Sequence, residues 1–263
     1  MMVFPLPTTT TPWVDTAYFP SRPYLAFIPA QTGSRRIADK AIRQFAGKPL
    51  LAHTIIAAQK SGIFSEIFVQ SDSREYLDVA TIYGAKAEEM GPRDPDAGDY
   101  ENWMLPLMKR TARLFPYAVA ILRVTSPFRS AASIVRAREI LESNLNADSV
   151  RAITPTRSHP AKSWQIHQSH DTMYSYDTMY SVMPGILNGQ PWHSRPTEQL
   201  PLVYVQTAGL EIVRAEAFWR TETISGHVIA PIILEGAEAI DLNTPEDWEY
   251  AEIVAARHPE LLP

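Results

Sequence analysis

Short apolar runs alternate along the chain with segments in which apolar residues recur every three or four positions. The runs predict buried strands over residues 25–29, 66–71, 118–124 and 149–154. The periodic segments predict helices near residues 49–61, 74–83, 100–114 and 131–143. Strands that alternate with helices in this way predict a mostly parallel sheet covered by helices on both faces.

Polar residues mark the starts of three predicted helices. Ser73 and Ser130 directly precede two of them, and Thr244 precedes a closing helix near residues 245–256. Hydroxyl side chains at these positions are expected to accept hydrogen bonds from backbone N–H groups of the first helical turn. Two further strands are predicted over residues 203–213 and 228–234.

Ligands of parallel sheets bind at the carboxyl ends of the strands. Residues 31–40 and 123–126 follow two of the predicted strands, and Asp72 follows a third. These segments are therefore expected to gather at one edge of the sheet.

Residues 155–202 interrupt the alternation and form a candidate inserted lobe. They are rich in Pro, His, Ser, Tyr and Met, and they contain the local repeat DTMYSY–DTMYS at 171–181. The simplest interpretation of this repeat is a duplication within a surface hairpin. Residues 1–22, rich in Pro and Thr, predict an extended or flexible N-terminal arm without the pattern of a secretory signal.

Composition excludes several classes of protein. Of 263 residues, 45% are hydrophobic and 20% charged, which is ordinary for a soluble globular domain. The net charge of −5 predicts no general attraction to nucleic acid, and no apolar run is long enough for a membrane span. The chain has no cysteine, which excludes disulfides and thiolate metal sites and suits a cytoplasmic location.

The loop after the first predicted strand is a candidate phosphate site. It holds Gly33, Ser34 and three basic residues, Arg35, Arg36 and Lys40. Backbone N–H groups can converge on an anion in such a loop, and glycine lets the backbone approach closely. Neither a Walker loop nor a dinucleotide fingerprint is present. The alternative is a solvated basic surface loop.

Four segments, taken in order, resemble the CMP-sialic acid synthetase (acylneuraminate cytidylyltransferase) family. They read YLAFIPAQTGSRRIADKAIRQFAGKPLL from residue 24, ILRVTSPFR from 121, DSVRAITPTRSHPAKSW from 148 and AIDLNTPEDWE from 239. The resemblance implies a three-layer α/β/α fold of the nucleotide-diphospho-sugar transferase type, Rossmann-like, with a small dimerisation lobe. It also implies transfer of CMP from CTP to a nonulosonic acid with release of pyrophosphate.

The resemblance further implies the organisation of the chain and the nucleotide site. Residues 23–263 would form the cytidylyltransferase domain, with 155–202 as the inserted lobe. Lys40 and Arg36 are the expected catalytic cations. The expected nucleotide-binding residues are Ala30, Gln31, Gly33, Ser34, Arg93, Arg123, Thr125 and Ser126. Arg129 is expected to be a structural ion-pair partner.

Asp241 and Asn243 are the candidate metal ligands. On an extended segment, two residues apart, their side chains would face the same way, and Mg²⁺ prefers oxygen ligands together with substrate phosphates. The resemblance assigns this pair to the metal, although the family usually has Asp where this chain has Asn243. The alternative is a turn before Pro245, with Thr244 capping the last helix, and both can hold at once.

A sugar acid requires a cation for its carboxylate. By resemblance, Lys162 and Arg195 are the candidates, and Gln199 and Tyr204 would line the same pocket, which a neighbouring subunit of a homodimer helps to form. Salt bridges within the lobe are an equally good explanation of the two cations.

Three departures from the family pattern leave alternatives open. Gln31 stands where the family usually has Arg, Ala41 replaces a frequent Asn, and TAGLE at 207–211 replaces an Asn-Gly-Ala-Ile-Tyr strand. Arg123 likewise replaces a common Gln. A nucleotidyltransferase for another sugar or nucleotide is one alternative, and a catalytically silent nucleotide-binding homologue is another. A glycosyltransferase of similar fold would need an Asp-x-Asp motif, of which Ser71–Ser73 is a poor version.

Overall fold

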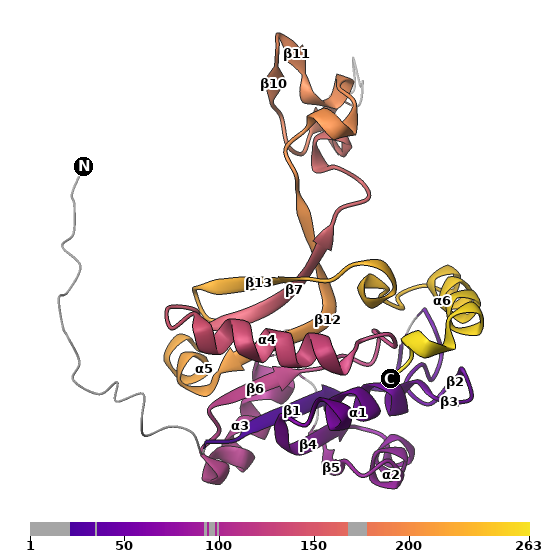
Figure 1. Ribbon diagram of the computed structural model, residues 1–263, viewed down its shortest axis with the longest axis vertical. Helices are drawn as coiled ribbons and strands as arrows, with labels where there is room; N and C mark the ends of the chain where they lie inside the picture. The colour runs from indigo at the N-terminus through magenta and orange to yellow at the C-terminus, as the bar shows by residue number, and fades with distance from the viewer. Residues whose placement is uncertain (1–21, 35, 92–93, 95–97, 99, 168–177) are drawn as a thin grey trace, which may run out of the picture.

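The computed structural model describes residues 22–34, 36–91, 94, 98, 100–167 and 178–263. Its centre is a seven-stranded sheet with the order β13-β7-β12-β6-β1-β4-β5 (Figure 1). The strands are β1 (Tyr24–Pro29), β4 (Phe64–Ser71), β5 (Lys86–Glu89), β6 (Ala118–Ile121), β7 (Ser149–Pro155), β12 (Tyr204–Arg214) and β13 (Ile229–Ile233). Only β12 pairs antiparallel with its neighbours in this sheet, so the predicted mostly parallel sheet is confirmed.

The strand order reverses at β1. The chain continues from β1 to β4 and β5 on one side, and it returns to β6 on the other. A crevice therefore opens at the carboxyl end of β1, which is where sheets of this type bind ligands. This reversal fixes the place of the candidate site.

Helices cover both faces of the sheet. Alternate residues of β1 belong to two different cores, one on each face. Leu25 and Phe27 pack in a core with α3 (Leu105–Thr111) and α5 (Ala215–Thr221). Ala26 and Ile28 pack in a larger core on the opposite face. That core also contains residues of α1 (Leu50–Ser61), α2 (Arg74–Ile82), α4 (Ala131–Ser143) and α6 (Pro245–Arg257). The three-layer α/β/α arrangement is confirmed.

The predicted helix caps are present. Ser73 and Ser130 accept hydrogen bonds from the N–H groups of Tyr76 and Ser133. Thr244 forms a reciprocal capping box with Asp247, the third residue of α6. Among the residues that the structure describes, no helix is long and apolar enough to cross a membrane.

Several elements differ from the sequence prediction. Helix α5 was not predicted, and the strand expected over residues 118–124 ends at Ile121. The strand β5 was not predicted, because its sequence KAEE is charged and only its pairing with β4 makes it a strand. The helix expected near 100–114 consists of a π-helical turn (Tyr100–Met104), α3 and a 3₁₀ turn (Ala112–Leu114). Pro106 has no N–H to donate, so a regular α-helical ladder cannot continue through it.

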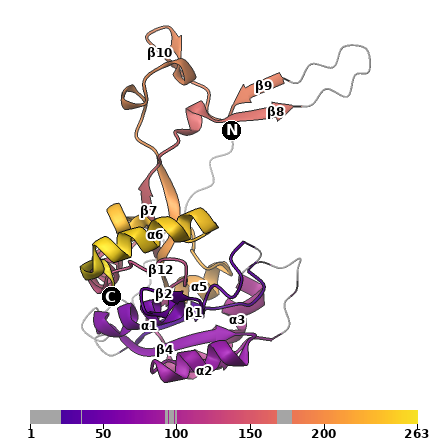
Figure 2. The same ribbon diagram turned by 90° about the vertical axis from the view of Figure 1, so that its right-hand side faces the viewer.

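Residues 156–167 and 178–203, called the extension below, project away from the body of the molecule between β7 and β12 (Figures 1 and 2). Short pairs build it: β8 (Trp164–His167) with β9 (Thr178–Ser181), and β10 (Ile186–Leu187) with β11 (Gln190–Pro191). The first copy of the predicted repeat lies outside the described residues.

The base of the extension is fixed by a buried histidine. The Nδ1 of His159 accepts a hydrogen bond from the Ala161 N–H at 3.1 Å. Its Nε2 therefore carries the proton and donates to the carbonyl of Pro201 at 2.9 Å. The His159 imidazole therefore connects the chain segment that enters the extension to the segment that leaves it.

Asp148 joins three segments at the opposite end of β7. Its carboxylate accepts the N–H groups of His227 (2.8 Å) and Val228 (3.1 Å) and pairs with Arg220 at 2.5 Å. Burial raises the pKa of Asp148, but these N–H groups and the Arg220 guanidinium outweigh it, and the net pKa lies below its ordinary value.

We expect Asp148→Asn to lower the free energy of unfolding at pH 7 by about 1–3 kcal/mol, because buried N–H groups and Arg220 lose a charged acceptor. A folded-state pKa below the unfolded value stabilises the fold above that unfolded pKa, about 3.9, and the stabilisation disappears as pH falls through the folded pKa. Urea titrations between pH 7 and pH 3 should show a difference between wild type and variant that is constant down to about pH 5 and shrinks below about pH 4. A difference that stays the same down to about pH 3 would contradict this role.

Candidate active site

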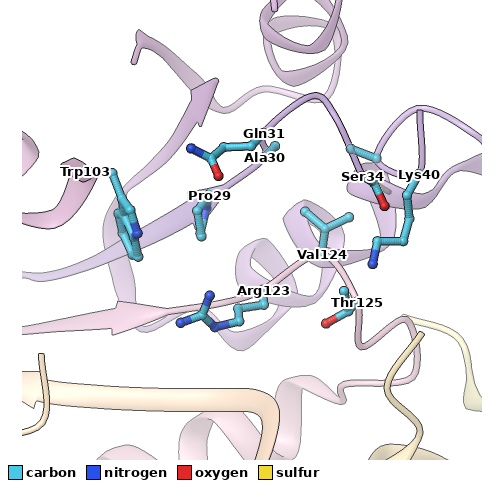
Figure 3. A pocket seen from close by; sticks show the side chains of 10 residues that line it. Pro29, Ala30, Gln31, Ser34, Lys40, Trp103, Arg123, Val124 and Thr125 are labelled. Atoms are coloured by element: carbon cyan, nitrogen blue, oxygen red, sulfur yellow. The ribbon is translucent and has the colours of Figure 1, made fainter. Parts of the chain in front are cut away.

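A pocket of about 160 Å³ opens at the carboxyl ends of β1 and β6, where the strand order reverses (Figure 3). Three segments form its walls: the end of β1 with its loop, the π-helical turn and the end of β6. The lining residues are Pro29, Ala30, Gln31, Ser34, Lys40, Ala41, Trp103, Arg123, Val124 and Thr125. Its charged side chains are Lys40 and Arg123, so the pocket is cationic.

The loop after β1 is anchored to the end of β4. The carboxylate of Asp72 accepts the backbone N–H of Thr32 at 2.8 Å and its hydroxyl at 2.7 Å. Gly33 follows with φ +75°, a left-handed conformation that favours glycine. The expected gathering of this loop with Asp72 and the end of β6 is confirmed.

Lys40 connects the loop to the C-terminal part of the chain. Its Nζ donates to the carbonyl of Leu242 at 2.8 Å, and the N–H of Leu242 donates to the carbonyl of Thr125 at 2.8 Å. Burial lowers the pKa of Lys40, and the neighbouring Asp241 carboxylate opposes this shift. Lys40 is therefore a half-buried cation beside a carboxylate, at the edge of the pocket.

Asp241 and Asn243 lie on the same side of their segment. The Nδ2 of Asn243 donates to Oδ2 of Asp241 at 2.6 Å, and its Oδ1 accepts from Arg36 at 3.3 Å. The other carboxylate oxygen of Asp241, Oδ1, is buried and has no hydrogen-bond partner. Asp247 fixes the segment by accepting the N–H groups of Asn243 and Thr244, so the capping box of α6 also orients these side chains.

Thr125 and Ser126, which follow β6, have unpaired hydroxyls. Both oxygen atoms are buried without a hydrogen-bond partner, but only Thr125 lines the pocket. Buried polar atoms normally have partners, so the Thr125 hydroxyl and Oδ1 of Asp241, each in a residue that lines a pocket, are available to a ligand.

Arg129 stabilises the segment that follows β6 by hydrogen bonds to backbone carbonyls. It is fully buried, and it donates to the backbone carbonyls of Gly209 and, at 2.6 Å, of Arg123. Burial lowers the pKa of Arg129 to about 9, which Asp241 and Glu238 partly oppose. The predicted ion pair is wrong in detail: backbone carbonyls, rather than a carboxylate, accept the guanidinium N–H groups.

Comparisons with known proteins show the family to which the chain belongs. A family model described as cytidylyltransferase matches residues 25–162. The CMP-N,N'-diacetyllegionaminic acid synthase of Legionella pneumophila is 31% identical over 243 residues, which cover 90% of this chain and 98% of that protein. The chain belongs to the cytidylyltransferase family.

Two further relatives show how the similarity is distributed. A pseudaminic acid cytidylyltransferase of Campylobacter jejuni is 54% identical over 63 residues, which are 24% of this chain and 27% of that protein. A CMP:2-keto-3-deoxy-manno-octonic acid synthetase, solved in complex with CTP, has the same fold with a TM-score of 0.63. It is 14% identical and covers 90% of this chain and 99% of that one.

Within this cytidylyltransferase, most of the predicted nucleotide-site residues lie together. Ala30, Gln31, Ser34, Arg123 and Thr125 line the pocket with Lys40. Gln31 donates to the sulfur of Met90 at 3.1 Å. Arg36 lies beside Asn243, and Arg93 lies outside the described residues.

The predicted sugar-site residues are placed elsewhere. Lys162, Arg195 and Gln199 belong to the extension, and Tyr204 is the first residue of β12 at its base. None of the four lines the cationic pocket of its own chain. The structure of one chain thus does not bring the two predicted sets together.

A second pocket, of about 610 Å³, includes Asp241 in its wall. Three carboxylates line it, Glu235, Asp241 and Asp247, against one cation, Arg157. Phosphates are therefore better accommodated in the first pocket, where Lys40 and Arg123 are the charged residues.

Sequence reasoning missed Trp103 and Glu211. Trp103 lies in the wall of the pocket, but nothing in its local sequence distinguishes it from a core aromatic residue. Glu211 is a buried carboxylate in β12 that pairs with Arg151 at 2.6 Å and lies 4.0 Å from Arg123. A single acidic residue inside the apolar run GLEIV was the available signal, because isolated buried carboxylates need partners.

Proposed function

We propose that this cytidylyltransferase transfers CMP from CTP to a nonulosonic acid, a sialic-acid-like sugar acid, and releases pyrophosphate. The observation that carries the proposal is the cationic pocket at the strand-order reversal, in which Lys40 also donates to the backbone of Leu242, between Asp241 and Asn243. The similarity to a CMP-N,N'-diacetyllegionaminic acid synthase, matched over 98% of its length, supports the choice of substrate class.

In this reaction a sugar hydroxyl attacks the α-phosphate of CTP in line. The new bond joins the sugar oxygen to phosphorus, the bond to the bridging oxygen of the β-phosphate breaks, and pyrophosphate leaves. Lys40, Arg36 and Ser34, with Gly33 backbone, are proposed to hold the triphosphate, and Lys40 compensates charge that develops on it. Ala30, Gln31, Thr125 and Ser126 are proposed to contact the nucleotide from β1 and β6.

Magnesium is the proposed cofactor. The buried Oδ1 of Asp241 has no hydrogen-bond partner, so it can serve as an oxygen ligand of the metal. Among the described residues, no group of three or more His, Cys, Asp or Glu offers an alternative metal site. Magnesium bound by one carboxylate and substrate phosphates would neutralise phosphate charge. The Oδ1 of Asn243 is neutral and already accepts a hydrogen bond from Arg36, so Asp241 would be the principal protein ligand.

A homodimer would place the predicted sugar residues at an active site. Lys162, Arg195 and Gln199 belong to the extension, which projects from the body of its own chain (Figure 2). The extension also exposes Trp164, Ile166 and Ile186, whose burial against a second copy would be favourable. We propose that the extension of one chain completes the sugar pocket of its partner.

Pyrophosphate release from CTP, UTP, ATP and GTP, each with sialic, legionaminic or pseudaminic acid, tests the reaction. We expect release with CTP and one or more of these acids, in the presence of Mg²⁺. Release with another nucleotide would support nucleotidyl transfer with a donor other than CTP. No release with any pair would favour the silent homologue.

Lys40→Ala and Lys60→Ala are the matched variants for this assay. Lys40→Ala should reduce the rate by about 10²–10³-fold without unfolding the chain, the usual effect of removing one group that stabilises charge in the transition state. Lys60, exposed in the last turn of α1, should be replaceable without loss.

Mixing two inactive variants tests the shared site. Lys40→Ala inactivates the part of the site that the body of the chain supplies. Arg195→Ala removes a residue that the extension supplies. If extensions are exchanged between subunits, one site of each mixed dimer is intact, and an equimolar mixture should regain about a quarter of wild-type activity. No recovery, with mixed dimers demonstrated by differently tagged chains, would show that each extension serves its own body.

A further inference from the structure

The loop after β1 is held at both of its ends by one segment, the end of β4 with the first turn of α2. At the start of the loop, the Asp72 carboxylate accepts the N–H and the hydroxyl of Thr32. At its end, the hydroxyl of Tyr76 donates to Oδ1 of Asp39 at 3.2 Å. This second contact lies one residue before Lys40, the proposed catalytic cation.

Asp39 has a backbone conformation that residues other than glycine rarely adopt. Its φ is +46°, in the left-handed region. Ile37 and Ala41, on either side of it, are both buried in the larger core, so the chain turns between two anchored residues. The Asp39 carbonyl closes this turn by accepting the N–H groups of Ile42 at 3.1 Å and Arg43 at 3.0 Å. Such conformations persist where their surroundings fix them, and they concentrate at functional sites.

Lys40 lies inside this turn, so the turn sets the direction of its side chain. Lys40 lines the pocket and reaches toward Thr125 (Figure 3). Its Nζ donates to the carbonyl of Leu242 at 2.8 Å. A cation stabilises charge in a transition state best when it is held in place before the reaction. The conformation of Asp39 therefore bears directly on the group proposed to hold the triphosphate.

Tyr76 is well suited to hold Asp39. It packs in the larger core and is only 2% exposed. Its backbone is also fixed, because its N–H donates to the capping hydroxyl of Ser73. Burial, with a further contribution from the Asp39 carboxylate, raises the pKa of Tyr76 to about 12. The hydroxyl therefore keeps its proton at neutral pH, and a rigid ring presents this donor to Asp39.

We propose that Tyr76 and Asp39 are positioning residues for Lys40, because the hydrogen bond between them holds the turn that directs the Lys40 ammonium into the pocket. This inference rests on the proposed function. Neither Tyr76 nor Asp39 is among the residues that line the pocket, so each acts on the reaction through Lys40. The alternative is a hydrogen bond that contributes to the stability of the fold alone.

Tyr76→Phe removes the hydroxyl and keeps the buried ring. We expect kcat/KM for CTP to fall roughly two- to tenfold, the usual value of one hydrogen bond. KM for the sugar acid should stay unchanged, because Lys40 is proposed to act on the triphosphate. Pyrophosphate release measures both constants. Tyr83→Phe, at the C-terminal end of the same helix, is the matched control and should lose nothing.

Substitutions of Asp39 separate the hydrogen bond from the backbone conformation. Asp39→Gly adopts the positive φ without strain but removes the acceptor, so it should lose as much activity as Tyr76→Phe. Its unfolding temperature should stay close to that of wild type, because relief of strain offsets the greater freedom of glycine in the unfolded chain. Asp39→Asn keeps an acceptor oxygen and tolerates the left-handed region, so it should lose far less activity than Asp39→Gly. Wild-type activity in Asp39→Gly would overturn the inference.

A double-mutant comparison distinguishes positioning from stability alone. If Tyr76 acts through Lys40, adding Tyr76→Phe to Lys40→Ala should cause no further loss of rate. The same fractional loss with and without Lys40 would contradict the inference, as would wild-type rates in Tyr76→Phe. Thermal unfolding shows whether each variant is folded. If Asp39→Gly fails to fold, the comparisons with Tyr76→Phe still decide.

Failure of the proposed function gives a different result. A wild type that CTP stabilises but that releases no pyrophosphate would reject the reaction, and CTP binding would then test the inference. Tyr76→Phe should reduce the thermal stabilisation by CTP, and Lys40→Ala should reduce it further. Undiminished stabilisation of Tyr76→Phe would overturn the inference. A wild type that no nucleotide stabilises would reject the proposed function and the inference together.

Discussion

The backbone of Leu242 is the connection on which the site depends. Its carbonyl accepts the Lys40 ammonium and its N–H donates to Thr125, so it joins the loop after β1, the end of β6 and the segment before α6. Lys40 and Leu242 are 202 positions apart in the chain. Only the reversal of strand order at β1 brings these segments to one edge of the sheet, and the capping box of α6 then orients Asp241 and Asn243.

Charge is distributed unevenly around this connection. The pocket at β1 and β6 is lined by cations, whereas the neighbouring pocket at β7 and α6 is lined mainly by carboxylates. Asp241 lies in the wall of the second pocket and beside Lys40 of the first pocket. Burial lowers the pKa of Lys40. A triphosphate in the first pocket would be balanced by Lys40 and Arg36, and a metal at Asp241 would supply the charge that Gln31 and Asn243 do not.

Much of the fold could be predicted from the sequence, because apolar runs, helical periodicity and capping residues agree with one another. The loop with Lys40 and the Asp241 segment could also be predicted, since each directly follows or precedes a recognisable element. The pairing of Glu211 could not, because its neighbours Arg123 and Arg151 come from the segment after β6 and from β7, and local sequence does not determine the order of these strands. Strand β5 escaped prediction for the same reason: pairing with β4, and not its composition, makes it a strand. The proposed completion of the sugar site by a second chain follows from the family resemblance, because Lys162 and Arg195 lie outside the cationic pocket of their own chain.

The proposed function puts a nucleoside triphosphate in the cationic pocket and a metal at Asp241. Thermal unfolding of wild type and Asp241→Asn with CTP, with and without Mg²⁺, is the measurement that tests this arrangement. Saturating CTP with Mg²⁺, at a hundred times its dissociation constant, should stabilise the wild type by about 2.7 kcal/mol. This stabilisation should require Mg²⁺ in the wild type, and Asp241→Asn should lose most of the metal dependence. Equal stabilisation of both proteins, with or without the metal, would contradict it.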